Sequence, residues 1–219
     1  MAWQAALRRA QRAEGERSQR GSERVRSARA HAAVVALALA PLAWLAQGAL
    51  RGGLGANPVE TITHTTGGWA LRCLLACLAI TPLRRAVPRL AALAPYRRTF
   101  GLLAFLYAVL HAATFFALDL GFVFARIAEE IAKRPYITLG FTALVLMTPL
   151  AVTSTRSWQR RLGRRWLTLH KLAYAAAALA VAHFLWLVKA DLREPLIYAA
   201  MLAALLGARA IRAARHLNS

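Results

Sequence analysis

Residues 170–186 read "HKLAYAAAALAVAHFLW", an apolar stretch with a histidine near each end, His170 and His183. Its length and composition are typical of a helix that crosses a membrane. An imidazole in hydrocarbon has no water to satisfy its two nitrogens, and burying it without a partner costs on the order of several kcal/mol. We therefore expect both histidines to be bonded to something inside the membrane.

The same apolar character recurs along the whole chain of 219 residues, which is 58% hydrophobic with a mean hydropathy of +0.42. Stretches of about 20 residues with few charges are long enough to cross about 30 Å of hydrocarbon as helices. We predict an all-α integral membrane protein, a six-helix transmembrane bundle with spans near 31–50, 68–83, 99–118, 135–153, 167–188 and 195–211. Residues 31–211 form this bundle, between a basic and mobile tail at 1–30 and a short tail at 212–219.

The chain carries 29 Lys and Arg against 9 Asp and Glu, a formal net charge of +20. In a soluble protein this charge would suggest nucleic acid. Here the arginines alternate with the spans and form no continuous groove, so we expect no nucleic-acid partner. They gather in the N-terminal tail, at 84–98, at 154–166 and at the C-terminus, which predicts that both termini are cytoplasmic.

Three of the six histidines, His111, His170 and His183, fall inside predicted spans. At a rise of 1.5 Å per residue, His111 lies about 18 Å and His183 about 24 Å from the cytoplasmic ends of their helices, whereas His170 has barely entered. Two histidines at one depth on different helices can hold one haem iron from opposite faces. Zinc would need three or four ligands, with Cys or carboxylate among them, and such residues are missing near these histidines in the sequence, so we favour haem over zinc.

The position of His170 leaves several readings open. It lies about 19.5 Å from His183 along the helix axis, so the two cannot share one iron, and a second haem in the inner leaflet would fit. Thirteen residues also place the two side chains about 140° apart round an ideal helix, so either the helix is distorted or they face different neighbours. We interpret His64 as a loop residue, and His31 and His216 as solvated residues at cytoplasmic span ends.

Several motifs together resemble the haem-binding membrane subunit of the periplasmic methionine sulfoxide reductase system, the MsrQ (YedZ) family, within the ferric-reductase-like transmembrane superfamily. They occur in order between about residues 50 and 200: "NPVE", "ITPLRR", "FGLLAFLYAVLH", "RPYITLG", "TSTRSWQRRLGRRWLTLHKLAY" and "AHFLWLVKAD". The resemblance implies a multi-pass protein of the bacterial inner membrane, surrounded by lipid. The haem histidines of the family match His111, His170 and His183, and His64 also falls where relatives have a histidine.

The resemblance further implies one or two b-type haems and a flavin mononucleotide (FMN). Family members take electrons from quinol and pass them to a periplasmic molybdopterin catalytic subunit of the MsrP type, which repairs oxidised methionine in proteins. This chain would then be an electron-transfer subunit rather than the catalytic one. We expect the partner to dock at the outer loops, steered by Asp119, Glu129, Glu130, Asp191 and Glu194.

Two other functions remain as alternatives. A stand-alone ferric or flavin-linked transmembrane reductase would predict a nicotinamide-binding domain, and no GxGxxG motif is present. A proton-coupled transporter with histidine relays would want carboxylates inside the spans, whereas those of this chain fall in the predicted loops and tail.

Overall fold

The computed structural model describes the backbone of residues 2–188 and 191–217, and the side chains of residues 3, 25–188 and 191–215. The chain divides into two units, Met1–Trp44 and Leu45–Ser219. Helix α1 (Ala2–Arg51) forms the first unit and extends into the second. The side chains of residues 4–24 in the predicted basic tail, and that of His216, lie outside the described residues.

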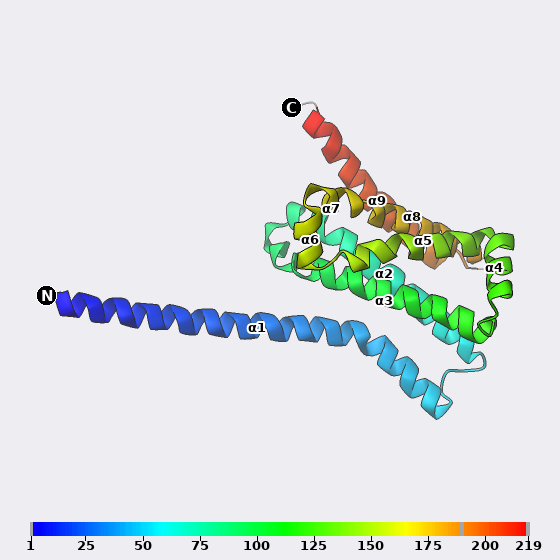
Figure 1. Ribbon diagram of the computed structural model, residues 1–219, viewed down its shortest axis with the longest axis horizontal. Coiled ribbons are helices and arrows are strands. Elements are labelled where there is room, and N and C mark those ends of the chain that lie inside the picture. Colours follow the sequence, from blue (N-terminus) through cyan, green and yellow to red (C-terminus); the bar gives the residue numbers. More distant parts are fainter. Residues whose placement is uncertain (1, 189–190, 218–219) are drawn as a thin grey trace. The chain divides into compact units, whose positions relative to one another are not determined.

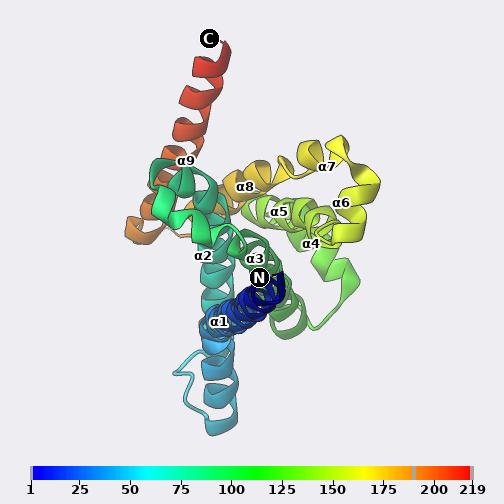
Figure 2. The ribbon, with the colours of Figure 1, turned by 90° about the vertical axis from the view of Figure 1, so that its left-hand side faces the viewer.

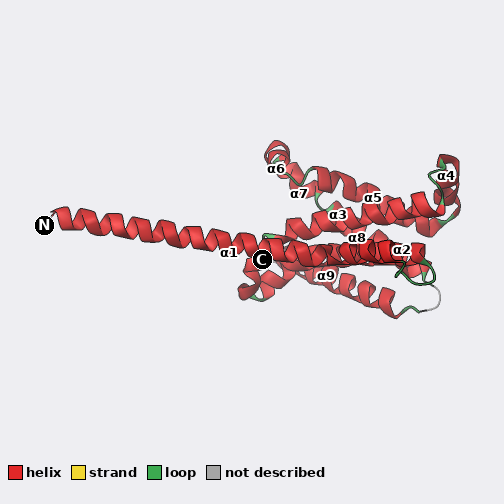
Figure 3. Ribbon diagram, turned by 90° about the horizontal axis from the view of Figure 1, so that it is seen from below, coloured by secondary structure: helices red, strands yellow, loops and turns green. Residues whose placement is uncertain are grey.

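The second unit is built from helices in the part of the chain that is described, with no strand among them (Figures 1 and 3). The all-α prediction is therefore confirmed. The helices and helical turns after α1 are α2 (Pro58–Ala86), η1 (Pro88–Leu93), α3 (Tyr96–Thr114), η2 (Phe115–Asp119), α4 (Phe124–Lys133), α5 (Pro135–Val152), α6 (Arg156–Leu162), α7 (Arg164–Leu169), α8 (Leu172–Leu187) and α9 (Arg193–Leu217).

Six segments in the described part of the chain are long and apolar enough to cross a membrane, as the sequence predicts. They are Val25–Arg51, Pro58–Ala86, Tyr96–Asp119, Pro135–Val152, Arg164–Leu187 and Arg193–Arg215. Many of their outward side chains are apolar and exposed, for example Leu106, Val145 and Ile197. Lipid is the solvent that such a surface fits, because an exposed apolar surface of this extent is rare on soluble proteins.

Four of these spans surround the interior of the second unit. Helix α2 packs along α3, and α5 packs along α8; α3 also contacts α5, and α2 contacts α8. This ring places α3 and α8 diagonally opposite each other, with α9 against α2 and α8 (Figure 2). Ala104, Ala176 and Ala177 are fully buried, and such small residues let membrane helices approach closely.

Helix α2 begins at Pro58, almost three turns before its predicted start at residue 68. Asn57 caps it, with Oδ1 accepting a hydrogen bond from the Glu60 amide at 3.2 Å, and Pro58 occupies the first turn, where its missing N–H costs nothing. The prediction was wrong here because Thr, His and Gly in the first turns lower the hydropathy. His64 therefore lies on a helix, and its interpretation as a loop residue was also wrong.

Candidate cofactor-binding site

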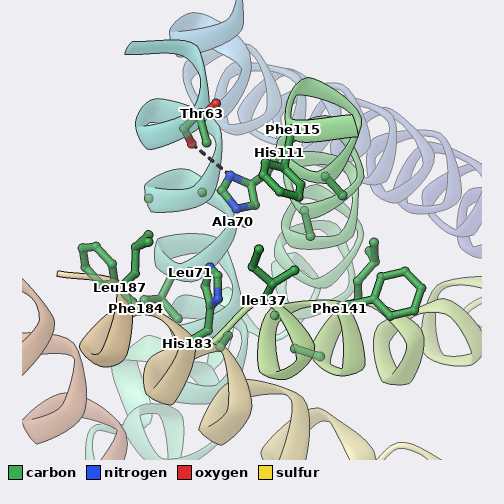
Figure 4. A pocket seen from close by; sticks show the side chains of 18 of the residues that line it. Thr63, Ala70, Leu71, His111, Phe115, Ile137, Phe141, His183, Phe184 and Leu187 are labelled. Atoms are coloured by element: carbon green, nitrogen blue, oxygen red, sulfur yellow. Dashed lines mark hydrogen bonds between the residues drawn. The ribbon is translucent and has the colours of Figure 1, made fainter. Parts of the chain in front are cut away.

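Two histidines from diagonally opposite helices meet in the interior of the second unit. His111 lies near the end of α3 and His183 in the last turns of α8, and both project into the space between α2, α3, α5 and α8 (Figure 4). Their ring centres are 6.1 Å apart and their planes are 76° from parallel. The structure thus brings together the two histidines that the sequence places at similar depth on different helices.

Each imidazole is fixed by a backbone carbonyl of a neighbouring helix. His111 Nδ1 lies 3.0 Å from the Thr63 carbonyl oxygen on α2, and His183 Nδ1 lies 2.6 Å from the Tyr136 carbonyl oxygen on α5. A carbonyl only accepts, so each Nδ1 must carry the proton and donate it. Each Nε2 is then left with a lone pair, which is the form in which histidine binds a metal.

The separation of the two rings suits one metal ion held between them. An imidazole nitrogen lies about 1 Å from its ring centre and bonds a metal at about 2 Å, so two imidazoles on opposite sides of one ion have centres about 6 Å apart. The observed 6.1 Å agrees with this value. Among the described residues, no group of three or more His, Cys, Asp or Glu side chains lies close enough together to hold a metal ion.

The pocket around the pair is strongly apolar. Thr63, His64 and Tyr136 line it near the Pro58 end of α2 and the Pro135 end of α5, and the Thr63 hydroxyl is buried without a hydrogen-bond partner among the described residues. Deeper in the bundle its walls are the aliphatic side chains of Leu71, Leu74, Ala143, Leu144, Met147 and Ala180. A flat, apolar group that binds metal at its centre and carries polar substituents at one edge would match this lining.

His64 reaches the rim of this pocket but not its centre. Its side chain is 54% exposed, and its Nε2 lies 3.9 Å from Glu60 Oε1, one turn earlier on α2. The described geometry therefore places His64 beside the pair rather than within it.

His170 occupies a separate place at the other end of the bundle. The helix predicted over 167–188 is interrupted there, since α7 ends at Leu169 and α8 begins at Leu172. The His170 ring stacks on Trp166 with centres 3.9 Å apart, and its Nδ1 lies 3.1 Å from the Trp166 carbonyl oxygen. The structure shows both features that the 140° separation left open: the helix is interrupted at His170, and the two histidines contact different neighbours.

Comparison with known proteins shows which family the chain resembles. The family described as "Ferric reductase like transmembrane component" matches residues 66–181. Curated relatives named "Protein-methionine-sulfoxide reductase heme-binding subunit MsrQ" include one from Xanthomonas oryzae pv. oryzae, 52% identical over 81% of this chain and 84% of the relative. Another, from Rhodospirillum rubrum, is 47% identical over 85% of this chain and 90% of the relative.

The chain belongs to the MsrQ family. The match to the ferric-reductase-like component includes His111 and His170 and ends two residues before His183. The resemblance found in the sequence motifs is thereby confirmed at the level of the family.

In this member of the MsrQ family, three of the acidic residues that the sequence analysis expects in the outer loops are paired with cations of the same chain. Glu129 lies 2.5 Å from Lys133 and Glu130 lies 2.7 Å from Arg134, both on or next to α4. The hydrogen bond and charge of Lys133 lower the pKa of Glu129, and Glu129 in turn raises the pKa of Lys133. These pairs cancel much of the charge that the sequence offered for steering a partner.

Arg72, a cation inside the second span, is also paired. Its guanidinium donates to Glu194 Oε1 at 2.9 Å and to the Tyr198 hydroxyl at 2.8 Å, both on α9. The Tyr198 hydroxyl donates to the same Glu194 oxygen at 3.0 Å. Because side chains on a helix tilt toward its N-terminus, Arg72 reaches toward the Pro58 end of α2, where α9 begins.

The carbonyls of Thr63 and Tyr136 are functional groups that sequence reasoning missed. A backbone carbonyl has no side-chain signature, and the pairing depends on which helices become neighbours. For Thr63, the sequence would first have had to show that α2 begins at Pro58 rather than at residue 68. The low hydropathy of that segment concealed its helical structure.

Proposed function

We propose that this protein is a membrane b-type cytochrome that carries electrons to a methionine sulfoxide reductase. The observation that carries the proposal is the pair His111 and His183, with ring centres 6.1 Å apart and both Nδ1 atoms engaged by carbonyls. The names of its relatives, heme-binding subunits of protein-methionine-sulfoxide reductase, support the choice of haem over other metal groups.

The residues of the pocket fit haem b. His111 and His183 would hold the iron through Nε2, and the aliphatic walls would receive the macrocycle. The buried Thr63 hydroxyl, which lacks a partner among the described residues, is a donor suited to a carboxylate at the haem edge. When bound, haem supplies a centre that accepts and releases one electron at a time.

The chain's own residues contribute positioning, tuning and exclusion of water. The two carbonyls keep each Nδ1 protonated and increase the basicity of each ligand. The apolar walls exclude water, which lowers the local dielectric and affects the redox potential of whatever the histidines hold. None of these roles needs a substrate-binding side chain in the pocket, which suits an electron-transfer subunit.

We extend the proposal to His170 as ligand of a second haem or of another redox group toward the predicted cytoplasmic side. Its support is a partly buried imidazole whose Nδ1 faces a carbonyl, as in the outer pair. FMN, which the family resemblance implies, is a further cofactor in this proposal. The arginines between α5 and α7 are cations to which its phosphate could bind.

The electron source and acceptor complete the proposal. Quinol in the bacterial inner membrane would supply electrons, and a periplasmic molybdopterin catalytic subunit of the MsrP type would receive them. Reduction of one sulfoxide takes two electrons and two protons and releases water, so the one-electron carrier must act twice per turnover.

A reduced-minus-oxidised absorbance spectrum of the purified protein tests this proposal. We expect b-type haem bands after addition of a quinol analogue, and their reoxidation after addition of the periplasmic catalytic subunit with methionine sulfoxide. Protein that is correctly inserted but carries no haem would refute the cytochrome proposal. Reoxidation by ferric chelates but not by the catalytic subunit would instead favour a stand-alone ferric reductase.

A further inference from the structure

Each of the two central imidazoles lies against a glycine of the neighbouring helix. A Cβ atom added at Gly67 on α2 would lie 3.0 Å from His111 Nδ1 and 3.0 Å from its Cε1. A Cβ atom added at Gly140 on α5 would lie 2.9 Å from His183 Nδ1 and 3.1 Å from its Cε1. Ordinary carbon contacts begin near 3.5 Å, so alanine at either position would push the ring or the helix away.

The backbone conformation at Gly67 and Gly140 does not require glycine. Neither has a positive φ, unlike Gly52, Gly55, Gly121 and Gly163. Both lie inside helices, where glycine is less stable than alanine by about 0.5–1 kcal/mol. The close approach of an imidazole is the structural feature that explains their presence.

Each glycine lies four residues after the residue whose carbonyl accepts the hydrogen bond from the histidine. Thr63 and Gly67 are four residues apart on α2, and Tyr136 and Gly140 are four apart on α5. In a helix the carbonyl of residue i accepts the amide of residue i+4, and the i+4 side chain tilts back toward that carbonyl. Without a side chain at i+4, the second lone pair of the carbonyl is open to another donor.

The same arrangement therefore occurs twice, once for each ring. A carbonyl at i accepts from the histidine Nδ1, and a glycine at i+4 gives the ring room to reach it. Figure 4 shows the first of these hydrogen bonds, between His111 and Thr63. The two copies lie on α2 and α5, the helices that alternate with α3 and α8 round the bundle. We call each pair of carbonyl and glycine a cradle, Thr63 with Gly67 and Tyr136 with Gly140.

We propose that Gly67 and Gly140 are positioning residues for the two histidines, which set the ring orientation and the protonated nitrogen of each ligand. This inference rests on the proposed haem site. Loss of a cradle would turn the imidazole away and break the hydrogen bond from its Nδ1. Because that bond makes the imidazole a stronger electron donor, its loss should favour the ferrous state and raise the midpoint potential.

The test compares Gly67→Ala and Gly140→Ala with two matched controls. Gly101→Ala lies inside α3, where the added Cβ would meet only Cys77 Sγ at 3.5 Å, and Gly207→Ala lies inside α9 with open space around it. We expect both cradle variants to bind haem about 10-fold more weakly, as is typical when a partner of a ligand is lost. The haem they retain should show an altered low-spin signal and a higher midpoint potential, whereas the controls match the wild type.

Membrane levels and size-exclusion profiles of all four variants separate positioning from misfolding. Cradle variants that insert and elute normally but bind haem poorly would support the inference. If their affinity, low-spin signal and potential equal those of the wild type, the inference is wrong and the haem site still stands. If they are lost from the membrane together with haem, the glycines act in folding, and the inference is also wrong. Absence of haem from the wild type would instead refute the proposed function.

Discussion

The His111 and His183 rings meet edge to face in the interior of the bundle, with centres 6.1 Å apart and planes at 76°. They come from α3 and α8, which occupy opposite corners of the four-helix ring and are joined through α2 and α5. The spacing is therefore set by the two intervening helices, whose carbonyls also fix both rings.

Replacing either member of the pair should remove the low-spin haem signal. His111→Ala or His183→Ala leaves one imidazole on the iron, and five-coordinate iron is high-spin. His31→Ala serves as the control, since His31 does not line the pocket. Absorbance and electron paramagnetic resonance spectra of the three purified variants check this; an unchanged low-spin signal in both pocket variants would contradict the ligand assignment.

His170→Ala should leave the signal of the His111–His183 pair intact while lowering the ratio of haem to protein. The reason is that His170 lies outside the pocket and stacks on Trp166 instead. Haem quantification by pyridine haemochrome, alongside protein assay, measures the ratio. An unchanged ratio would show that His170 is not a haem ligand, and its role would then be confined to the helix break.

Arg72→Leu should destabilise the bundle by loosening α9 from α2. The substitution removes two interhelical hydrogen bonds and leaves Glu194 without its cation. Polar interhelical bonds in membranes are worth about 0.6 kcal/mol on average, so the loss should be on the order of 1 kcal/mol and the melting temperature should fall by about 2–4 °C. Lys133→Gln, which breaks an exposed pair on α4, is the control; equal melting temperatures for both variants would contradict this role.

Salt should have only a small effect on electron delivery to the periplasmic partner. From the sequence we expect acidic residues of the outer loops to steer a basic partner, but Glu129, Glu130 and Glu194 each lie beside a cation of this chain. Raising ionic strength from 0.1 M to 1 M shortens the screening length from about 10 Å to about 3 Å. Stopped-flow reoxidation of the haem at both strengths measures the effect, and a steep fall in rate would restore electrostatic steering.

Hydropathy was enough to predict the six spans, because a span is recognised by a run of apolar residues. Helical rise was enough to place His111 and His183 at similar depth, because depth depends only on position along a helix. The first ten residues of α2, before residue 68, were not predictable from hydropathy. Their helical structure depends on the cap at Asn57 and on burial of polar residues such as Thr66 where α2 packs on α3. The Thr63 and Tyr136 carbonyls could not be found because they require the arrangement of the helices. The same holds for the pairing of Arg72 with Glu194, whose residues are 122 positions apart.

The most direct test of the central claim is the low-temperature electron paramagnetic resonance spectrum of the oxidised protein purified with its haem. Imidazole planes close to perpendicular leave two iron d orbitals nearly equal in energy, which gives a low-spin signal with one unusually large g value. The 76° between His111 and His183 predicts that signal, together with its loss in His183→Ala. A high-spin signal in the wild type, or a rhombic low-spin signal typical of parallel imidazoles, would contradict the arrangement described here.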